Sequence, residues 1–268
     1  MLIKQMNCSF KDPNQTKKII SALADGLETL NMNCSSDGIK VAATNMSHTD
    51  MRELTLTPDW FNSYTCPRDC TMGVHMPTLK KFMSTAGDKD IIKWTHDPVK
   101  ALLKIEIEEA GDNKGHKEWK LKLIDFDEEA LAPPPNPTFT VSFRVATVLV
   151  HDWVQNAKIL SGDFCIGVEK DKHINISGVG DAGEMHLKQP LPSVMATVFN
   201  YEPDFTKLAM TMSIKEAEHL DVMIKCAPGV DIQLSRVLPV CATSYLDETR
   251  TSFIRLWIAP KLEEDDDD

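Results

Sequence analysis

The stretch Pro13–Thr44, PNQTKKIISALADGLETLNMNCSSDGIKVAAT, contains the pattern on which the fold depends. Asp12 comes directly before it, and Pro13 suits the first turn of a helix, where its missing amide proton has no partner to lose. One side of this helix is apolar: Ile19, Ile20, Leu23, Leu27 and Leu30. Two short runs follow, Met32–Cys34 and Ile39–Thr44, with a turn at Ser35–Gly38 between them. The stretch predicts one helix followed by an antiparallel hairpin.

The same order returns along the chain. A second helix is predicted from about Pro77 to Gly87, which suits a left-handed C-cap because it lacks a Cβ. A third is predicted from about Ala146 to Gly162. Ser213, with Glu216 three residues later, forms a capping box for a fourth. Successive helix starts lie 64, 69 and 67 residues apart, which indicates an internal repeat.

Strand patterns accompany these helices. After the third helix they fall at Asp163–Val168 and Ile174–Ser177, with a turn at Lys170–Lys172. Short strands joined by tight turns are typical of antiparallel sheets rather than of parallel crossovers. The sequence therefore predicts an α+β fold of two similar domains, each made of two units of one helix plus antiparallel strands.

The segment Asp125–Pro137 separates the two predicted domains. Acidic residues followed by four prolines in five positions cannot join a sheet interior, because proline lacks the amide donor. We expect an N-terminal domain at 1–121, a connector at 122–138, a C-terminal domain at 139–262 and a disordered acidic tail at 263–268.

Composition limits the class of protein. The chain has 268 residues, 42% of them hydrophobic, and a formal net charge of -11. It shows neither a charged-then-apolar leader nor an apolar run long enough to span a membrane, so we expect a soluble intracellular protein. Seven cysteines in a chain without a secretory signal favour reduced thiols. The closest pair, Cys66 and Cys70, has poor spacing for zinc.

Two segments offer alternatives from enzyme chemistry. Gly178–Gly183 matches the dinucleotide fingerprint G-x-G-x-x-G, but Glu184–Lys188 alternates like a strand where that motif needs a helix. We therefore expect a glycine-rich hairpin turn. The acidic group at Asp125–Glu129 lacks the spacing of a calcium loop. We expect no catalytic residues, cofactor or metal, and a metal- or nucleotide-dependent enzyme remains the alternative of another class.

Lysines recur on the polar side of every predicted helix. Alone, they are expected to keep the exposed faces solvated. If the repeat places all four helices on one surface, they form a basic face on an acidic protein and become candidates for DNA binding. These candidates are Lys17, Lys18, Lys80, Lys81, Lys158 and Lys225.

Four segments of the chain match the motifs of one known family. Ser47–Leu56, SHTDMRELTL, is similar to S-H-V-S-L-V-x-L-T-L, and Tyr64–Val74, YTCPRDCTMGV, to Y-R-C-D-R-x-x-x-M-G-V. Lys122–Glu129, KLIDFDEE, is similar to the entry to that family's interdomain connector, and Leu256–Glu263, LWIAPKLE, to its C-terminus. The matches occur in order over nearly the whole chain, which therefore resembles the proliferating cell nuclear antigen family of DNA sliding clamps.

The resemblance implies a non-enzymatic ring of three subunits that encircles duplex DNA. Helices would line the hole, and their lysines would meet backbone phosphates without reading bases. Lys17, Lys81 and Lys225 match the family's basic positions best. Ring closure would pair the edge strands at about His116–Leu121 and Glu184–Lys188 of neighbouring subunits.

The resemblance also implies partners. DNA polymerase, clamp loader, flap nuclease and ligase would bind through short peptides in a pocket beneath the connector, at Thr44, His48, Met51, Leu131, Pro133, Pro134, Pro239, Ala259 and Pro260. Lys170 lies where relatives accept ubiquitin or its homologues. The expected location is the nucleus, or the site of viral DNA replication. A checkpoint-type or viral relative that works in a hetero-ring or as a monomer remains the alternative.

Overall fold

A computed structural model describes residues 6–111, 115–125, 133–170 and 172–261. The chain divides into two compact units. Unit 1 comprises Met1–Met46, Arg52–Pro133 and Tyr245–Ile254, and unit 2 comprises Ser47–Met51, Pro134–Ser244 and Arg255–Asp268. The domain limits expected from the sequence stay a prediction. Among the described residues, every helix is too short or too polar to cross a membrane.

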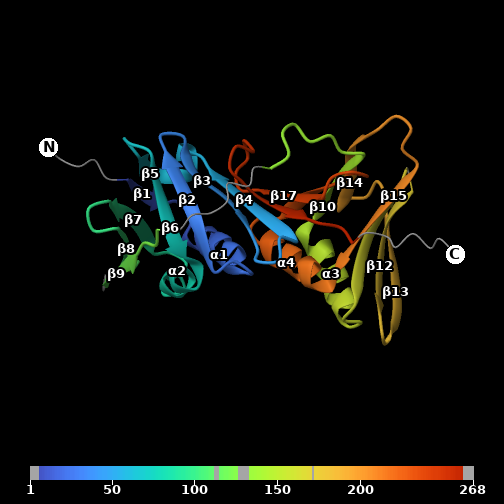
Figure 1. Ribbon diagram of the computed structural model, residues 1–268, viewed down its shortest axis with the longest axis horizontal. Helices are drawn as coiled ribbons and strands as arrows, with labels where there is room; N and C mark the ends of the chain where they lie inside the picture. The colour runs from blue at the N-terminus through green and yellow to red at the C-terminus, as the bar shows by residue number, and fades with distance from the viewer. Residues whose placement is uncertain (1–5, 112–114, 126–132, 171, 262–268) are drawn as a thin grey trace. The chain divides into compact units, whose positions relative to one another are not determined.

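Unit 1 contains two helices and two runs of adjacent strands (Figure 1). The helices are α1 (Pro13–Ala24) and α2 (Met76–Met83). One sheet has the order β5-β1-β7-β8-β9: β5 (Phe61–Thr65), β1 (Asn7–Phe10), β7 (Ile91–Asp97), β8 (Leu102–Glu108) and β9 (His116–Lys122). The other run has the order β4-β3-β2-β6: β4 (Asp50–Leu56), β3 (Gly38–Thr44), β2 (Thr29–Ser35) and β6 (Cys70–His75). The first two residues of β4, Asp50 and Met51, belong to unit 2. A 3-10 turn, η1 (Pro58–Trp60), precedes β5.

Unit 2 repeats this plan. Its helices are α3 (Thr147–Lys158) and α4 (Ile214–Ile224). One sheet has the order β13-β12-β11-β15: β13 (Gly183–Pro190), β12 (His173–Gly180), β11 (Asp163–Glu169) and β15 (Lys207–Ser213). The second run is β14-β10-β16-β17-β18: β14 (Ala196–Tyr201), β10 (Val141–Ala146), β16 (Gly229–Leu234), β17 (Val240–Tyr245) and β18 (Phe253–Ile258). Tyr245 of β17 and the first two residues of β18 belong to unit 1.

The strand pairs are antiparallel in both units, as in β1 with β7 and β11 with β12. This confirms the α+β class and the repeat of a helix followed by a hairpin. The fingerprint-like glycines form the predicted hairpin, because Gly180 pairs with Gly183 across a two-residue turn. Gly183 has a φ of 140°, which a residue with a side chain rarely adopts. No helix follows this turn, so the dinucleotide interpretation loses its structural basis.

Helix starts follow the predicted caps. The Asp12 carboxylate accepts from the amides of Asn14 and Gln15 at 2.8 and 3.0 Å. The Ser213 hydroxyl accepts from the Glu216 amide at 3.4 Å. Each cap supplies an acceptor to amides that have no partner inside the helix. The predicted starts of α1 and α4 are confirmed.

The predicted C-cap at Gly87 is wrong. Helix α2 ends at Met83, with Ser84 as its right-handed C-cap. Gly87 lies outside the left-handed region, and its amide instead donates to the Asp90 carboxylate at 2.7 Å. A Cβ on Gly87 would come within 3.2 Å of that carboxylate. The glycine therefore allows a close approach of Asp90 rather than a reversal of the helix.

The helices pack in pairs inside each unit, α1 beside α2 and α3 beside α4 (Figure 1). Leu23 and Leu79 are both fully buried. Phe82 of α2 stacks on Trp119 of β9, with ring centroids 4.7 Å apart and planes at 13°. The apolar residues within the helices hold each pair on its sheets, and the polar faces are left to carry charge. The predicted apolar side of the first helix was too long, because α1 ends at Ala24, so that Leu27 follows the helix and Leu30 lies on β2.

Candidate nucleic-acid interface and docking surface

The helices of unit 1 carry lysines and no acids. Within their helical ranges, α1 contributes Lys17 and Lys18, and α2 contributes Lys80 and Lys81. Lys18, Lys80 and Lys81 are exposed, and no described residue forms an ion pair with them. Lys17 differs, because its Nζ donates to the Asp88 carboxylate and to the Ala86 carbonyl, each at 2.9 Å.

The helices of unit 2 are acidic. Helix α4 carries Lys215 against three acids, Glu216, Glu218 and Asp221, and α3 carries one acid and one lysine. Both predicted cations of this unit have acidic partners. Lys158 pairs with Glu218, which raises the pKa of the lysine. Lys225 pairs with Asp221 at 3.2 Å.

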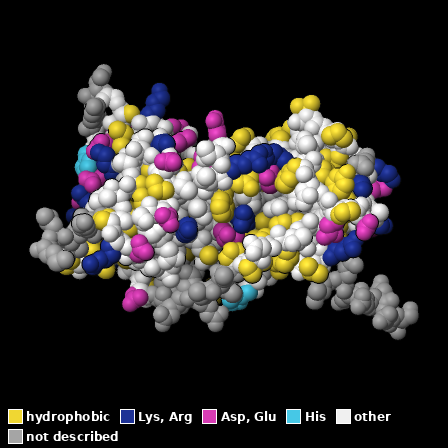
Figure 2. All heavy atoms as spheres, turned by 90° about the horizontal axis from the view of Figure 1, so that it is seen from above, with side chains coloured by type: hydrophobic (Ala, Val, Ile, Leu, Met, Phe, Trp, Pro, Cys, Tyr) yellow, Lys and Arg dark blue, Asp and Glu magenta, His cyan; other side chains and the backbone are white. Residues whose placement is uncertain are grey.

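Asp221 is the centre of a small network in unit 2. It is 4% exposed, and its carboxylate also contacts His151 Nδ1 at 2.7 Å and Gln155 Nε2 at 3.3 Å. Because a buried carboxylate needs such partners, the ammonium of Lys225 is held toward it. Figure 2 shows another face of the molecule, seen from above, on which both Lys or Arg and Asp or Glu side chains are present. The two helix pairs thus differ in charge although they share a fold.

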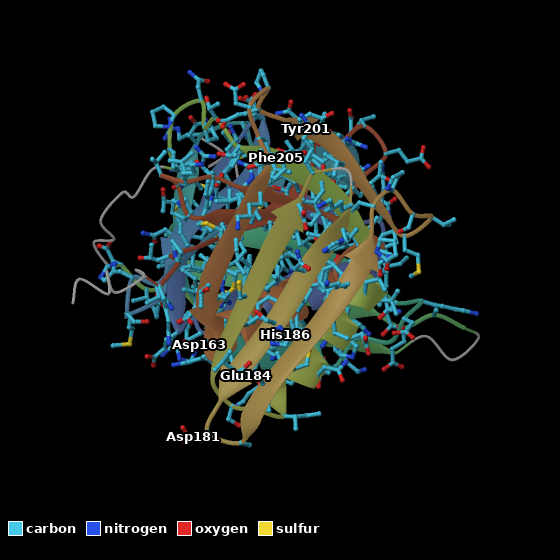
Figure 3. All side chains as sticks on the ribbon, turned by 90° about the vertical axis from the view of Figure 1, so that its right-hand side faces the viewer. Asp163, Asp181, Glu184, His186, Tyr201 and Phe205 are labelled. Carbon is cyan, nitrogen blue, oxygen red and sulfur yellow. The ribbon has the colours of Figure 1, made fainter. Side chains whose placement is uncertain are left out.

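Strand β13 is an edge of its sheet, as predicted for Glu184–Lys188. The amide of Leu191 donates to the Lys172 carbonyl at 3.0 Å, and with the register of the two strands this bond shows which residues of β13 are hydrogen-bonded to β12. Since inward and outward amides alternate along an antiparallel edge, Met185 and Leu187 donate to β12. The outward amides belong to Glu184, His186 and Lys188. Figure 3 shows Glu184 and His186 on this edge.

Strand β9 is the corresponding edge in unit 1. The Leu123 amide donates to the Ala101 carbonyl, and the Glu109 amide donates to the Gly115 carbonyl, each at 2.9 Å. With the β8–β9 register, these two bonds show which residues of β9 are hydrogen-bonded to β8. By the same alternation, the amides of Glu118 and Lys120 face outward. Both predicted edge strands are therefore edges that offer unpaired backbone groups.

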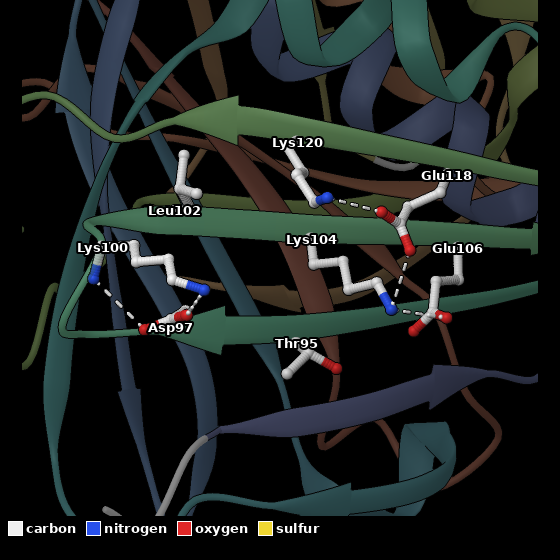
Figure 4. Close-up of a pocket in the computed structure, with 8 residues that line it drawn as sticks. All are labelled: Thr95, Asp97, Lys100, Leu102, Lys104, Glu106, Glu118 and Lys120. Carbon is white, nitrogen blue, oxygen red and sulfur yellow. Dashed lines mark hydrogen bonds and ion pairs between the residues drawn. The ribbon is translucent and has the colours of Figure 1, made fainter.

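A polar hollow of about 460 Å³ lies on the outer face of β7, β8 and β9 (Figure 4). Lys104 Nζ lies 2.8 Å from Glu106 and 3.0 Å from Glu118, and Lys120 lies 2.8 Å from Glu118. Lys120 and Lys104 lower the pKa of Glu118 to about 2. Ligand atoms of Glu106, His116 and Glu118 lie within 4.8 Å of one another. An ammonium already sits against both carboxylates, so ion pairing accounts for this cluster.

The predicted docking residues divide between the units. Thr44 is the last residue of β3 in unit 1. Pro133 also belongs to unit 1, as the last residue of its segment Arg52–Pro133. His48, Met51, Pro134, Pro239, Ala259 and Pro260 belong to unit 2. Leu131 lies outside the described residues. Unit 2 therefore contains most of the described candidates.

Unit 2 brings several of these residues together. Met51 and Leu238, the neighbour of Pro239, pack against a buried cluster of Phe139, Cys241 and Trp257. The Ala259 amide donates to the Thr49 carbonyl at 2.9 Å, beside His48. His48 is exposed with a φ of 54°. The result is a firm apolar floor next to an exposed loop.

Lys170 comes directly after β11 and is partly buried. Its Nζ is 4.5 Å from the centre of the Tyr201 ring and 3.5 Å from the Pro203 carbonyl. Tyr201 and Phe205 are marked in Figure 3. A cation over an exposed ring is held by about 0.5–1 kcal/mol, so Lys170 can leave this position readily.

Sequence reasoning missed the acidic partners of the lysines and the floor beneath Met51. One of these had a readable signal, because Asp221 precedes Lys225 by four residues on a helix, where opposite charges meet. Glu218 and Lys158 come from different helices, so their ion pair cannot be predicted from local spacing in the sequence. Phe139 and Trp257 are likewise joined only by the fold.

Comparison with known proteins agrees with this architecture. The model of the proliferating cell nuclear antigen N-terminal domain matches residues 5–130. The proliferating cell nuclear antigen of Chaetomium thermophilum is 24% identical over 256 residues, covering 93% of this chain and 95% of the relative. That of Dictyostelium discoideum is 22% identical over 253 residues, covering 92% and 95%.

The duplicated α+β plan and these full-length matches define a DNA sliding clamp. Clamps of this kind bind DNA and partner proteins as rings and do not themselves catalyse a reaction. The chain belongs to the proliferating cell nuclear antigen family.

Proposed function

We propose that three copies of this clamp close into a homotrimeric ring around duplex DNA and tether replication and repair enzymes to it. The observation that carries this proposal is the pair of edge strands, one in each unit. A contact between β9 of one copy and β13 of the next joins two different surfaces. Repeated contacts of this head-to-tail kind can close into a ring with rotational symmetry.

The two edges are chemically matched. On β9, Trp119 and Leu121 point toward the side covered by α2, and on β13, Met185 and Leu187 form the less exposed face. Their other faces are polar. If β9 and β13 paired, their apolar faces would form one continuous layer and their polar faces another. The outward amides and carbonyls of the two strands would then hydrogen-bond to each other.

Unit 1 supplies most of the attraction for DNA in this proposal. Lys18, Lys80 and Lys81 are available to phosphates, because no described acid pairs with them. Contacts to phosphates carry no sequence information, which suits a protein that must slide. The acids of α3 and α4 reduce the contribution of Lys158 and Lys225. The DNA would therefore lie nearer to the unit 1 helices than to those of unit 2.

Partner peptides would dock on the floor made by Met51, Phe139 and Trp257. A buried aromatic floor beside exposed backbone is typical of a site for an apolar plug. Ala259 and Pro260 would add backbone contacts, and Leu131, Pro133 and Pro134 stay proposed contacts of the peptide. DNA polymerase, clamp loader, flap nuclease and ligase are the proposed owners of such peptides.

Three further expectations belong to this proposal. The chain would act without catalysis, through topology alone. It would work in the nucleus, where the family's eukaryotic members replicate DNA. Lys170, once released from Tyr201, would be available for attachment of ubiquitin or a homologue.

Solution mass and particle imaging test the proposal together. Sedimentation at micromolar concentration should give three times the chain mass of 30.0 kDa, and electron micrographs should show a three-fold toroid. A monomer mass with no rings would refute the homotrimer. Rings that form only after a second, different clamp chain is added would favour the hetero-ring alternative.

A further inference from the structure

Three cysteine thiols gather at one end of the unit 1 core. Cys34 lies on β2, Cys70 is the first residue of β6, and Cys66 precedes β6 by a short turn. Cys34 and Cys66 are 2% and 6% exposed, whereas Cys70 is partly exposed. His96 of β7 lies close enough to lower the pKa of Cys70. Side chains from both sheets of the unit therefore meet around one accessible thiol.

Cys34 and Cys70 are directly opposite in the β2–β6 ladder. Opposite residues of an antiparallel pair have Cα atoms roughly 4.5–5.5 Å apart and side chains on the same face. Disulfides need a Cα separation of about 4.4–6.8 Å. The Met76 amide donates to the Glu28 carbonyl at 2.8 Å, so Cys34 and Cys70 form one of the hydrogen-bonded pairs of this ladder, with Cα atoms about 5.5 Å apart. This separation lies within the range for a disulfide, and closing the bond requires rotation of the side chains and a small approach of the two Cβ atoms.

The surroundings favour a thiolate on Cys70. The hydrogen bond from Cys34, followed by the charge and hydrogen bond of His96, lowers the pKa of Cys70 to about 6. The same hydrogen bond, together with burial, raises the pKa of Cys34. Burial raises the pKa of Cys66 to about 11 and also raises the pKa values of Tyr64 and Cys8 nearby. One thiolate is thus surrounded by protonated neighbours.

We propose that Cys70 is a peroxide-reactive cysteine that forms a reversible intramolecular disulfide with Cys34. The oxidant is a hydroperoxide, with hydrogen peroxide the simplest. The Cys70 thiolate attacks one peroxide oxygen, the O–O bond breaks, and after proton uptake water leaves and Cys70 is a sulfenic acid. The Cys34 sulfur then attacks the Cys70 sulfur, the S–O bond breaks, and the thiol proton leaves with the hydroxide as a second water.

The same cluster does not fit a zinc centre as well. In the part of the chain that the structure describes, no three of Cys34, Cys66, Cys70 and His96 bring ligand atoms within 4.8 Å of one another. A tetrahedral site would need all four at once. The thiols form a chain of neighbours centred on Cys70, which suits pairwise oxidation.

Trypsin makes the proposal directly measurable, because it places each cysteine in its own peptide: Cys34 in 19–40, Cys66 in 53–68 and Cys70 in 69–80. The full chain is treated with hydrogen peroxide, quenched with N-ethylmaleimide in acid, digested and analysed by mass spectrometry. The variants are Cys34→Ala, Cys66→Ala and Cys70→Ala. Cys165→Ala is the matched control, since Cys165 is the other partly exposed cysteine of the described chain.

We expect a crosslink between peptides 19–40 and 69–80 that dithiothreitol removes. It should persist in the Cys66 and Cys165 variants and vanish in the Cys34 and Cys70 variants. In Cys34→Ala, dimedone should instead trap the sulfenic acid on 69–80. A crosslink between 53–68 and 69–80 in the unaltered chain, crosslinks between copies, or no oxidation of Cys70 would each overturn the assignment. Dimedone labelling needs no disulfide, so it still reports on Cys70 if one variant folds poorly.

Discussion

Replacing His186 by proline tests the proposed ring at a single backbone atom. The His186 amide faces away from β12, because the Leu191 to Lys172 hydrogen bond fixes the phase of the ladder. Proline removes that amide proton and leaves the pairing within the hairpin intact. Such outward positions of edge strands are where proline is tolerated, so the single subunit should stay folded.

The expected magnitude follows from the hydrogen bonds that the ring would no longer make. At each interface, the missing amide leaves one carbonyl of the neighbouring copy without a partner, at about 1–3 kcal/mol. A three-membered ring has three such interfaces, so assembly is weakened by roughly 3–9 kcal/mol in total. At about 1.4 kcal/mol per factor of ten, the middle of this range lowers the association constant on the order of ten-thousand-fold.

Light scattering over a dilution series measures the effect. His186→Ala keeps the amide and should remain trimeric at concentrations where His186→Pro has become monomeric. Thermal unfolding of the proline variant checks that the subunit is still folded, and Lys120→Pro on β9 offers the same test from the other edge. Equal trimer mass for the proline and alanine variants throughout the series would refute the pairing.

Three other outcomes are expected. Lys80→Ala should make the negative slope of log K against log salt for a short duplex less steep, by about 0.9 for each phosphate that the lysine no longer neutralises. Lys158→Ala should change this slope less, because Lys158 is paired with an acid. Equal slopes for the two variants would contradict the charge difference between the units. Leu131→Ser should weaken binding of a partner peptide in titration calorimetry while sedimentation still shows a trimer, and an unchanged affinity would remove Leu131 from the docking surface. Because a thiolate with a pKa of about 6 persists above that pH, alkylation of Cys70 by iodoacetamide should fall to half near pH 6, and a midpoint near the ordinary value of about 8.5 would contradict the thiolate.

Much of the fold was predictable because its signals are local. Asp12 and Ser213 marked helix starts, since a side-chain acceptor next to free amides acts within a few residues. The strand after Gly183 followed from period-two alternation. The C-cap at Gly87 failed for a physical reason, since the glycine makes room for the Asp90 carboxylate, a neighbour that helix patterns do not reveal.

The candidate site was only partly predictable. The lysines were named from their pattern along the helices and the docking positions from the resemblance to sliding clamps, but what each residue can bind depends on the groups that lie opposite it. Lys80 and Lys81 remain available, whereas Lys158 meets Glu218 from another helix. The floor beneath Met51 joins residues from distant parts of the chain.

The sequence by itself determined the repeat, the α+β class and the resemblance to sliding clamps, because helix caps, apolar spacing and motif order are short-range properties of the chain. Only the tertiary structure decided which lysines are neutralised, which amides face outward on β9 and β13, and that Cys34 lies opposite Cys70. Those features depend on side chains and strands that are far apart in sequence, and packing, rather than local preference, brings them together.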